Sequence, residues 1–214
     1  MMSVSTTVFT STDANQNASD LYDWMLTNAS EYFDEITFSS PLITCKVGDT
    51  DFLKISTNNS QEMGITLPNG NVNMQTRPTA ICRTAYKTSS GLALFMDNST
   101  SIFVTKSDSG ATCAVSVGLW GFRKYRIIGA DVESSTGLTQ YPRTSEENFE
   151  YFSNLCDRSF TNAGKAALVP FTFDNGSYTP DLFLVPFSPF VGTRALLDLD
   201  GTKYVYDGCI ALKE

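Results

Sequence analysis

The sequence predicts a mainly β protein, an antiparallel sandwich or barrel-like sheet of hairpins, with an N-terminal amphipathic helix and a second short helix further along. Three observations predict this class. From residue 42 onward, short apolar runs alternate with turn residues at intervals of about ten residues. In the clearest runs every second residue is apolar, which is the period of a strand. Only one long segment has the apolar spacing of a helix.

The N-terminal segment, residues 1–16, is expected to be an extended arm. Its sequence is β-prone, but it contains too few apolar residues to bury much surface by itself. Such a segment can dock as an added strand on a neighbouring subunit. Residues 17–214 are then expected to form a single β-rich domain.

That domain is expected to open with a helix over residues 17–36. The apolar residues recur every four positions, at Leu21, Met25, Ala29 and Phe33. Asn17 or Ser19 can cap the first turn. The apolar face is expected to lie on a sheet or on a neighbouring subunit, and Trp24 and Met25 are the predicted contact residues on this helix.

Hairpins are predicted through the middle of the chain, because paired apolar runs flank short turns. The pairs are LITCKV with DFLKIS, GITL with NVNMQT, AICRTAYK with LALFMD, and SIFVTK with ATCAVSVG. Alternation is clearest at Ile102 and Val104 and again at Cys113, Val115 and Val117. The alternate positions include Ser101, Thr105, Thr112 and Ser116.

A second helix is predicted from about Ser145 to Leu155, because Thr144 and Glu147 have the spacing of a capping box. The apolar segment 170–190 that follows contains several prolines, which are poorly tolerated in central strands.

This proline-containing segment is therefore expected to be an edge strand or an extended arm. It is expected to pack either on another subunit or at the base of its own domain. Phe183, Phe187 and Phe190 are its predicted contact residues.

The C-terminal stretch LLDLDGTKYVYDGCIALKE contains two Asp-Gly pairs. A calcium loop of the EF-hand type would need Gly at its sixth position and Glu at its twelfth. Counted from Asp198, the glycine stands at the fourth position and Cys209 at the twelfth, so the pattern fails. The stretch instead predicts three strands, Ala195–Leu199, Thr202–Tyr206 and Cys209–Leu212, joined by Asp-Gly turns.

Composition excludes several classes of function. The net charge is −8 and the only local basic cluster is FRKYRI, so nucleic-acid binding is not expected. No apolar run is long enough for a membrane helix, and the N-terminus does not resemble a secretory signal. The chain has no histidine, which argues against Ser-His-Asp and Cys-His catalysis and most zinc sites. No metal or other cofactor is expected.

The cysteines are five in number and form no C-x-x-C motif. An odd, scattered set is typical of reduced and mostly buried thiols in a protein that folds in a cytoplasm. Their positions are Cys45, Cys82, Cys113, Cys156 and Cys209.

Carboxylate chemistry needs no histidine and stays open as an alternative. Glu146 and Glu147 could serve a glycan hydrolase, although acidic residues in the first turn of a helix also stabilise its dipole. Tyr141 and Tyr151 could stack on sugar rings in a carbohydrate-binding host-attachment module. The carbohydrate-binding module is the second functional alternative, and the glycan hydrolase is the third.

Two segments, SIFVTKSDSGATCAVSVG and LDLDGTKYVYDGCIALKE, carry a family resemblance. They resemble the β-rich virion proteins of tailed bacteriophages and prophages of gut Firmicutes, in which an I-x-x-T-K-[ST]-x-x-G hairpin precedes a closing meander. The resemblance covers about a fifth of the chain and carries no catalytic residues. It implies a structural component of the particle at the tail, collar or head surface.

The favoured function is therefore a non-enzymatic virion protein that folds in the bacterial host cytoplasm and assembles as an oligomer. Its expected partners are other copies of itself and neighbouring virion proteins, with a host glycan under the second alternative. The proposed contacts are the helix at Trp24 and Met25 and the arm at Phe183, Phe187 and Phe190.

Overall fold

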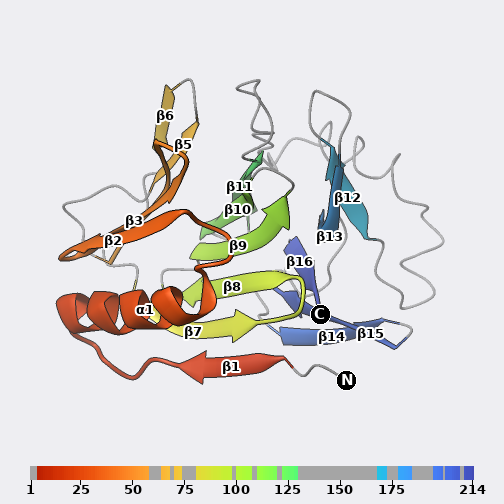
Figure 1. Ribbon diagram of the computed structural model, residues 1–214. Helices are drawn as coiled ribbons and strands as arrows, with labels where there is room; N and C mark the ends of the chain where they lie inside the picture. The colour runs from red at the N-terminus through yellow and green to blue at the C-terminus, as the bar shows by residue number, and fades with distance from the viewer. Residues whose placement is uncertain are drawn as a thin grey trace.

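Figure 1 shows the computed structural model of the chain. The residues that the structure describes are 4–57, 64–67, 70–73, 81–97, 100–107, 110–119, 122–129, 168–172, 178–184, 195–199, 201–207 and 210–214. The predicted second helix over 145–155 lies outside these residues.

The described elements comprise one helix and many short strands. In chain order they are β1 (Ser5–Val8), α1 (Ala14–Asn28), β2 (Glu35–Ser39), β3 (Leu42–Val47), β4 (Thr50–Ser56), β5 (Gly64–Leu67), β6 (Gly70–Asn73), β7 (Cys82–Lys87), β8 (Gly91–Met96), β9 (Thr100–Ser107), β10 (Gly110–Leu119), β11 (Phe122–Gly129), β12 (Val169–Thr172), β13 (Tyr178–Leu184), β14 (Ala195–Leu199), β15 (Thr202–Tyr206) and β16 (Ile210–Lys213). The predicted mainly β class is confirmed.

The strands form three antiparallel sheets. The central sheet has the order β1-β7-β8-β9-β10-β11, the second sheet β2-β3-β4-β5-β6, and the C-terminal sheet β12-β13-β16-β15-β14. Each of the hairpins predicted through the middle of the chain is present as a neighbouring pair of strands. None of these sheets closes into a barrel through its described strands.

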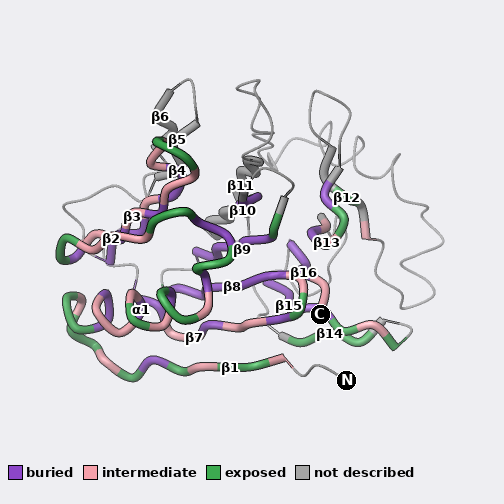
Figure 2. Tube along the Cα trace, viewed as in Figure 1, coloured by how far each residue is buried: buried purple, intermediate pink, exposed green. Residues whose placement is uncertain are grey.

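The central sheet has a separate hydrophobic core on each face. On one face, Leu92, Leu94 and Met96 of β8 pack with the apolar residues of α1 and the second sheet. On the other face, Ala93 and Phe95 pack with the C-terminal sheet. The strand β8 is consequently buried along its whole length, as Figure 2 shows.

The same two-sided burial changes the interpretation of the alternating strands. Ile102 and Val104 face the core on the α1 side, as their alternation predicts. The alternate positions on this strand are buried as well, because the C-terminal sheet covers the other face: Ser101, Phe103 and Thr105 are all nearly inaccessible to solvent. Alternation of apolar with Ser and Thr residues therefore does not mark a solvent-facing side here.

The helix α1 is shorter than the prediction of 17–36. It begins at Ala14, where the carboxylate of Asp13 caps it by accepting a hydrogen bond from the Gln16 backbone N–H at 2.9 Å. It ends at Asn28, and residues 35–39 form β2 instead. Ile36 opposes Cys45 of β3, so the apolar residue that extended the helical pattern belongs to a strand.

Asn17, which was predicted as a helix cap, has a different role. Its side chain is fully buried, and its amide pairs with the main chain of Cys82 in both directions. The Nδ2 group donates to the Cys82 carbonyl at 2.8 Å, and the Oδ1 atom accepts from the Cys82 N–H at 2.8 Å. The helix is thereby fixed to the start of β7, where the ladder with β8 has an irregularity.

For the described residues 4–16, the prediction of an extended arm is wrong. Residues 5–8 form β1, which pairs with β7 of the same chain, and the helix has already begun at residue 14. The intervening Phe9 is buried in the core on the α1 side. The main-chain groups of β1 that face β7 are therefore hydrogen-bonded within the same chain.

The three-stranded C-terminal meander is confirmed, with its last strand at Ile210–Lys213. Gly201 has a φ of 84° in the first turn, the left-handed conformation that an Asp-Gly hairpin requires. The edge-strand prediction for the proline segment is right for β12 and wrong for β13, which lies between β12 and β16. Pro180 is tolerated in β13 because the pairing with β16 begins only at Leu182.

Candidate interaction surface

The structure separates the two contact residues predicted on the helix. Met25 is fully buried in the core between α1 and the sheets, so the prediction that it lies on a contact surface is wrong. The apolar face of the helix covers the chain's own sheets. Trp24 is half-buried, and its Nε1–H group donates to the Thr7 hydroxyl at 3.1 Å, which joins α1 to β1.

Of the three predicted contact residues on the proline segment, only Phe183 lies in the described part of the chain. It is half-buried and packs edge-on against Tyr204, with ring centroids 6.0 Å apart. These rings lie in a small cluster of the C-terminal sheet. Phe187 and Phe190 lie outside the described residues.

The strand β1 is the outermost strand of the central sheet. Among the strands of this sheet whose side chains are described, β1 is the most exposed. Figure 1 shows it at the lower margin of the molecule, with β7 on its inner side. Ser5, Thr6 and Val8 are exposed, and the Val8 side chain is 67% accessible. No charged side chain precedes Asp13.

The register of β1 with β7 determines which main-chain groups are free. Val8 opposes Thr84, and the next residue, Phe9, donates its N–H to the Arg83 carbonyl at 3.0 Å. In an antiparallel ladder the N–H and C=O groups of successive residues point alternately toward and away from the partner strand. Thr6 and Val8 therefore direct their N–H and C=O groups away from β7.

Two further large apolar side chains are exposed, Leu26 on α1 and Leu196 on β14, at 44% and 49%. Sequence reasoning missed both of them and also Val8. For Leu26 a signal was available, because it falls outside the four-residue spacing that buries Leu21 and Met25. For Val8 and Leu196 the exposure depends on which strands end a sheet, and local sequence does not give that order.

The carboxylates considered for calcium binding are used in turns. The Asp198 carboxylate accepts a hydrogen bond from the Gly201 N–H at 3.0 Å. Asp207 is fully buried, and its carboxylate accepts from the Ile210 N–H at 2.7 Å. No group of three or more metal-ligating side chains occurs within the described residues.

Three of the five thiols lie in the described part of the chain, and all three are buried, as predicted: Cys45, Cys82 and Cys113. Burial raises the pKa of the Cys45 thiol far above its ordinary value of 9.0. Burial also raises the pKa of Cys113, with a smaller contribution from the neighbouring Cys45. A thiol that stays protonated is a poor nucleophile, so these two cysteines are packing residues.

Two tyrosines also have a raised pKa. For Tyr32 the main cause is burial, and the adjacent Glu31 adds to it. Burial likewise raises the pKa of Tyr204, with a smaller contribution from Asp181. Both phenols therefore remain neutral at physiological pH.

The residues behind the two alternative functions cannot be placed in this arrangement. The candidate catalytic carboxylates Glu146 and Glu147 and the candidate sugar-stacking residues Tyr141 and Tyr151 all lie outside the described residues. Among the elements that are described, no helix has both the length and the apolar character needed to cross a membrane.

Comparison with protein-family models, with curated proteins and with solved structures finds no match for this chain. Its functional interpretation therefore depends on the residues themselves.

Proposed function

We propose that this chain is a non-enzymatic structural subunit of a tailed-phage virion, which assembles with other copies of itself and with neighbouring virion proteins. The proposal starts from the resemblance of the SIFVTKSDSGATCAVSVG and LDLDGTKYVYDGCIALKE segments to β-rich virion proteins. A place at the tail, collar or head surface is part of the same proposal.

One observation carries the proposal: the two segments that resemble virion proteins pack against each other. The first forms β9 and β10, and the second forms β14, β15 and β16. Phe103 and Ala114 of the first segment share a buried cluster with Val205, Ile210 and Leu212 of the second. The segments 101–118 and 197–214, which lie far apart in the sequence, thus build one face of the central core, which supports the interpretation that they are parts of a single scaffold.

The chemistry of the described residues supports a scaffold role in the same way. Asp198 and Asp207 hold turns, and Cys45 and Cys113 are buried as neutral thiols. Each of these reactive side chains therefore has a structural use. The exposed, uncharged strand β1 in addition offers a surface for assembly.

The experiment that tests the proposal is to find the chain in particles. Phage particles would be induced from the organism that encodes it, purified on a density gradient and analysed by quantitative mass spectrometry. We expect the chain to co-sediment with the capsid and tail proteins at a constant ratio to them across the particle fractions. An abundant host protein serves as the control for contamination.

Immunogold labelling with an antibody against the chain would then locate it on the tail, collar or head. Particles that lack the chain, while the same lysate contains it in soluble form, would overturn the proposal.

A further inference from the structure

We propose that β1 is a self-association surface, at which two copies of the chain pair their β1 strands antiparallel around a twofold axis at Thr7. This inference rests on the proposed function, because it supplies a contact by which copies of a structural subunit would join. It identifies the strand, the register and the partner.

The first argument is the free main chain of β1. Thr6 and Val8 direct their N–H and C=O groups away from β7, as the hydrogen bond from the Phe9 N–H to Arg83 establishes. A row of free donors and acceptors along an exposed strand is a template for another strand. Two such edges from identical chains have matching donors and acceptors when they run antiparallel.

The second argument is the absence of the devices that usually protect an edge. Natural edge strands carry charged residues or proline, which oppose pairing with another chain. The terminal strands β2, β11 and β14 contain charged residues, and β12 contains Pro170. β1 contains only Ser, Thr and Val, residues that suit a strand.

The sixth terminal strand, β6, has no charge either, with the sequence Gly-Asn-Val-Asn. Glycine and asparagine are depleted in strands, so β6 is the poorer template of the two. Among the terminal strands in the described part of the chain, β1 is therefore the most suitable edge for strand addition.

The third argument is charge, because β1 is an edge at which a second copy can approach despite the net negative charge of the chain. The net charge of −8 makes two copies repel each other over most of their surfaces. The chain before Asp13 has no charged side chain, so two β1 strands can approach without bringing like-charged side chains of their own together. In contrast, two copies paired at β14 would bring together the exposed carboxylates of Asp198.

The register follows from which residues point outward. If Thr7 lies on the twofold axis, Thr6 of each copy opposes Val8 of the other, and both of these residues have outward main-chain groups. Each Thr6–Val8 pair can then exchange two hydrogen bonds. The exposed Val8 side chain would pack beside the methyl group of the opposing Thr6.

The two Thr7 residues would face each other as a pair without main-chain hydrogen bonds between them. In such a pair the Cα atoms are about 4.5 Å apart. On the same face, each Thr7 hydroxyl accepts from Trp24, so the two indoles would flank the axis. The contact would join two six-stranded central sheets into one continuous sheet.

Site-specific cross-linking tests this register. Thr7→Cys should form a disulfide-linked dimer on mild oxidation, because Cα atoms about 4.5 Å apart lie within the range that a disulfide can bridge. Thr6→Cys is the matched control, since an offset of two residues would place its copies about 8 Å apart, beyond that range. The wild-type chain, oxidised in parallel, reports any cross-link through the native thiols.

The result expected is at least a tenfold greater yield of dimer from Thr7→Cys than from Thr6→Cys or wild type, measured on a non-reducing gel. Equal yields from the two variants, or a greater yield from Thr6→Cys, would overturn the proposed register.

Analytical ultracentrifugation tests the surface without a cross-link. Val8→Lys should raise the dissociation constant of the dimer at least tenfold, because it places a like charge on both edges. Leu196→Lys is the matched control: it makes the same kind of change at an exposed residue of another edge strand, β14, and should leave association unchanged. Circular dichroism would verify that both variants are folded.

Loss of association with Leu196→Lys but not with Val8→Lys would reject β1 in favour of β14. A chain that occurs in purified particles but shows neither the Thr7 cross-link nor an effect of Val8→Lys would reject the β1 contact alone. A chain that is absent from particles but dimerises through β1 would reject the virion assignment alone.

Discussion

Strands β8 and β1 belong to the same sheet but differ in almost every property. β8, at an internal position, has the sequence GLALFM and is buried on both faces. β1, at the margin, has the sequence STTV and is largely exposed. In these two strands the position in the sheet is reflected in the composition: the fully apolar β8 is internal, and the short polar β1 ends the sheet.

Gly91 at the start of β8 is expected to tolerate substitution least. A Cβ atom at this position would collide with the main-chain carbonyl of Val104 on β9, and it would also meet the Leu212 side chain at 3.1 Å. Gly91→Ala should therefore lower the free energy of unfolding by more than about 5 kcal/mol or prevent folding. Urea unfolding followed by circular dichroism measures the change.

Gly201→Ala is the control for Gly91→Ala. Gly201 has a φ of 84° but nothing within 4 Å of the Cβ position, so only backbone strain is added there. Its cost should be about 1 kcal/mol. Equal losses at the two positions would show that the close approach of β8 to β9 is not what requires glycine.

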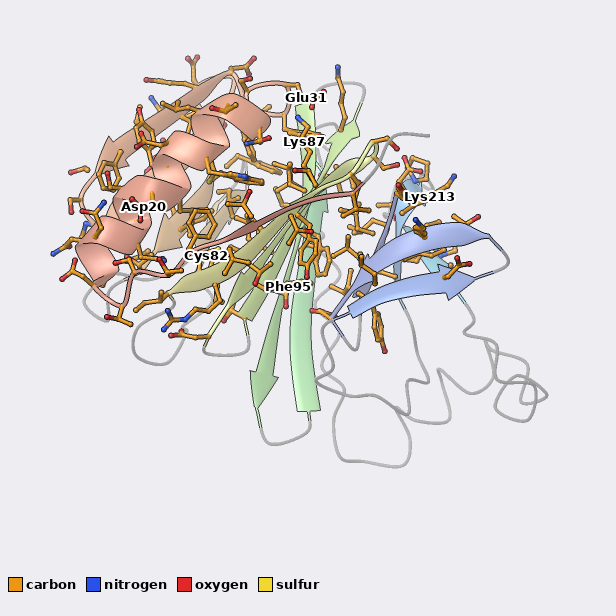
Figure 3. The ribbon with its side chains drawn as sticks, turned by 90° about the horizontal axis from the view of Figure 1, so that it is seen from below. Asp20, Glu31, Cys82, Lys87, Phe95 and Lys213 are labelled. Carbon is orange, nitrogen blue, oxygen red and sulfur yellow. The ribbon has the colours of Figure 1, made fainter. Side chains whose placement is uncertain are left out.

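Phe95 in the middle of β8 is expected to have the next largest effect. Its ring lies between the central and C-terminal sheets (Figure 3), and it packs against Phe103 at a centroid distance of 6.0 Å. Phe95→Ala should cost about 3–5 kcal/mol because it leaves a cavity in a core with little freedom to collapse. Val8→Ala on β1 is the matched truncation of an exposed residue, and its effect should stay within about 0.5 kcal/mol.

Asn17 fixes the helix to the start of β7, and its removal should have an intermediate effect. Asn17→Ala leaves both the N–H and the C=O of Cys82 without their side-chain partner in a buried environment. The expected loss is about 2–3 kcal/mol, since each buried unsatisfied group costs about 1–3 kcal/mol. Thermal and urea unfolding would measure it.

Asn15→Ala on the exposed side of the same helix is the control for Asn17→Ala. Asn15 makes only an exposed side-chain contact with Ser40, at 3.3 Å. Its loss should change the stability by no more than about 0.5 kcal/mol. Because alanine is the better helix former, a loss as large as that of Asn17→Ala could not come from helix propensity and would show that the buried amide pair is not what sets the effect at Asn17.

The buried thiols between the helix side of the central sheet and the second sheet predict a dependence on alkaline pH. The folded-state pKa of Cys113 is raised above its ordinary value of 9.0, so the unfolded chain releases this proton first. The stability contributed by the neutral thiol is complete below pH 9 and is lost as the pH rises above it. One such thiol contributes a slope of up to about 1.4 kcal/mol per pH unit.

Cys113→Ala tests this assignment of the slope. The variant should lose stability less steeply above pH 9 than the wild type, when both are measured by urea unfolding at a series of pH values. Its lower stability at neutral pH does not affect the comparison, because only the slope is compared. Parallel curves for the two proteins would contradict the burial of a neutral thiol at this position.

The contrast between β8 and β1 also shows how far the sequence predicted the structure. The hairpins and the closing meander followed from turn residues and two-residue alternation, which are local properties. The order of strands is not local, so the exposure of Val8 and the internal position of β13 were not predicted. The helix end was misplaced because Phe33 continues the four-residue spacing and Ile36 follows three residues later, although Phe33 lies after the turn that ends the helix and Ile36 lies in β2.

The contact residues were predicted less well than the fold, for a related reason. Met25 has the side chain of an interface residue, but a helix that lies on its own sheet uses such a residue in its core. What makes β1 a candidate surface is the direction of its free main-chain groups, which follows from pairing with β7. Residue types by themselves do not carry that information.

Thr7→Val is expected to have the smallest effect, and it tests how firmly β1 is held against the helix. The substitution keeps the size and branching of the side chain but removes the acceptor for the half-buried Trp24 N–H. The loss should be about 0.5–1.5 kcal/mol, the net value of one such hydrogen bond, and Trp24 fluorescence should change. Thr6→Val makes the same change on the opposite face of the strand, where the side chain is exposed, and should leave both stability and Trp24 emission unaltered. If Thr6→Val had the larger effect, the assignment of faces on β1 would be reversed, and with it the side of the sheet on which Trp24 flanks the proposed twofold axis.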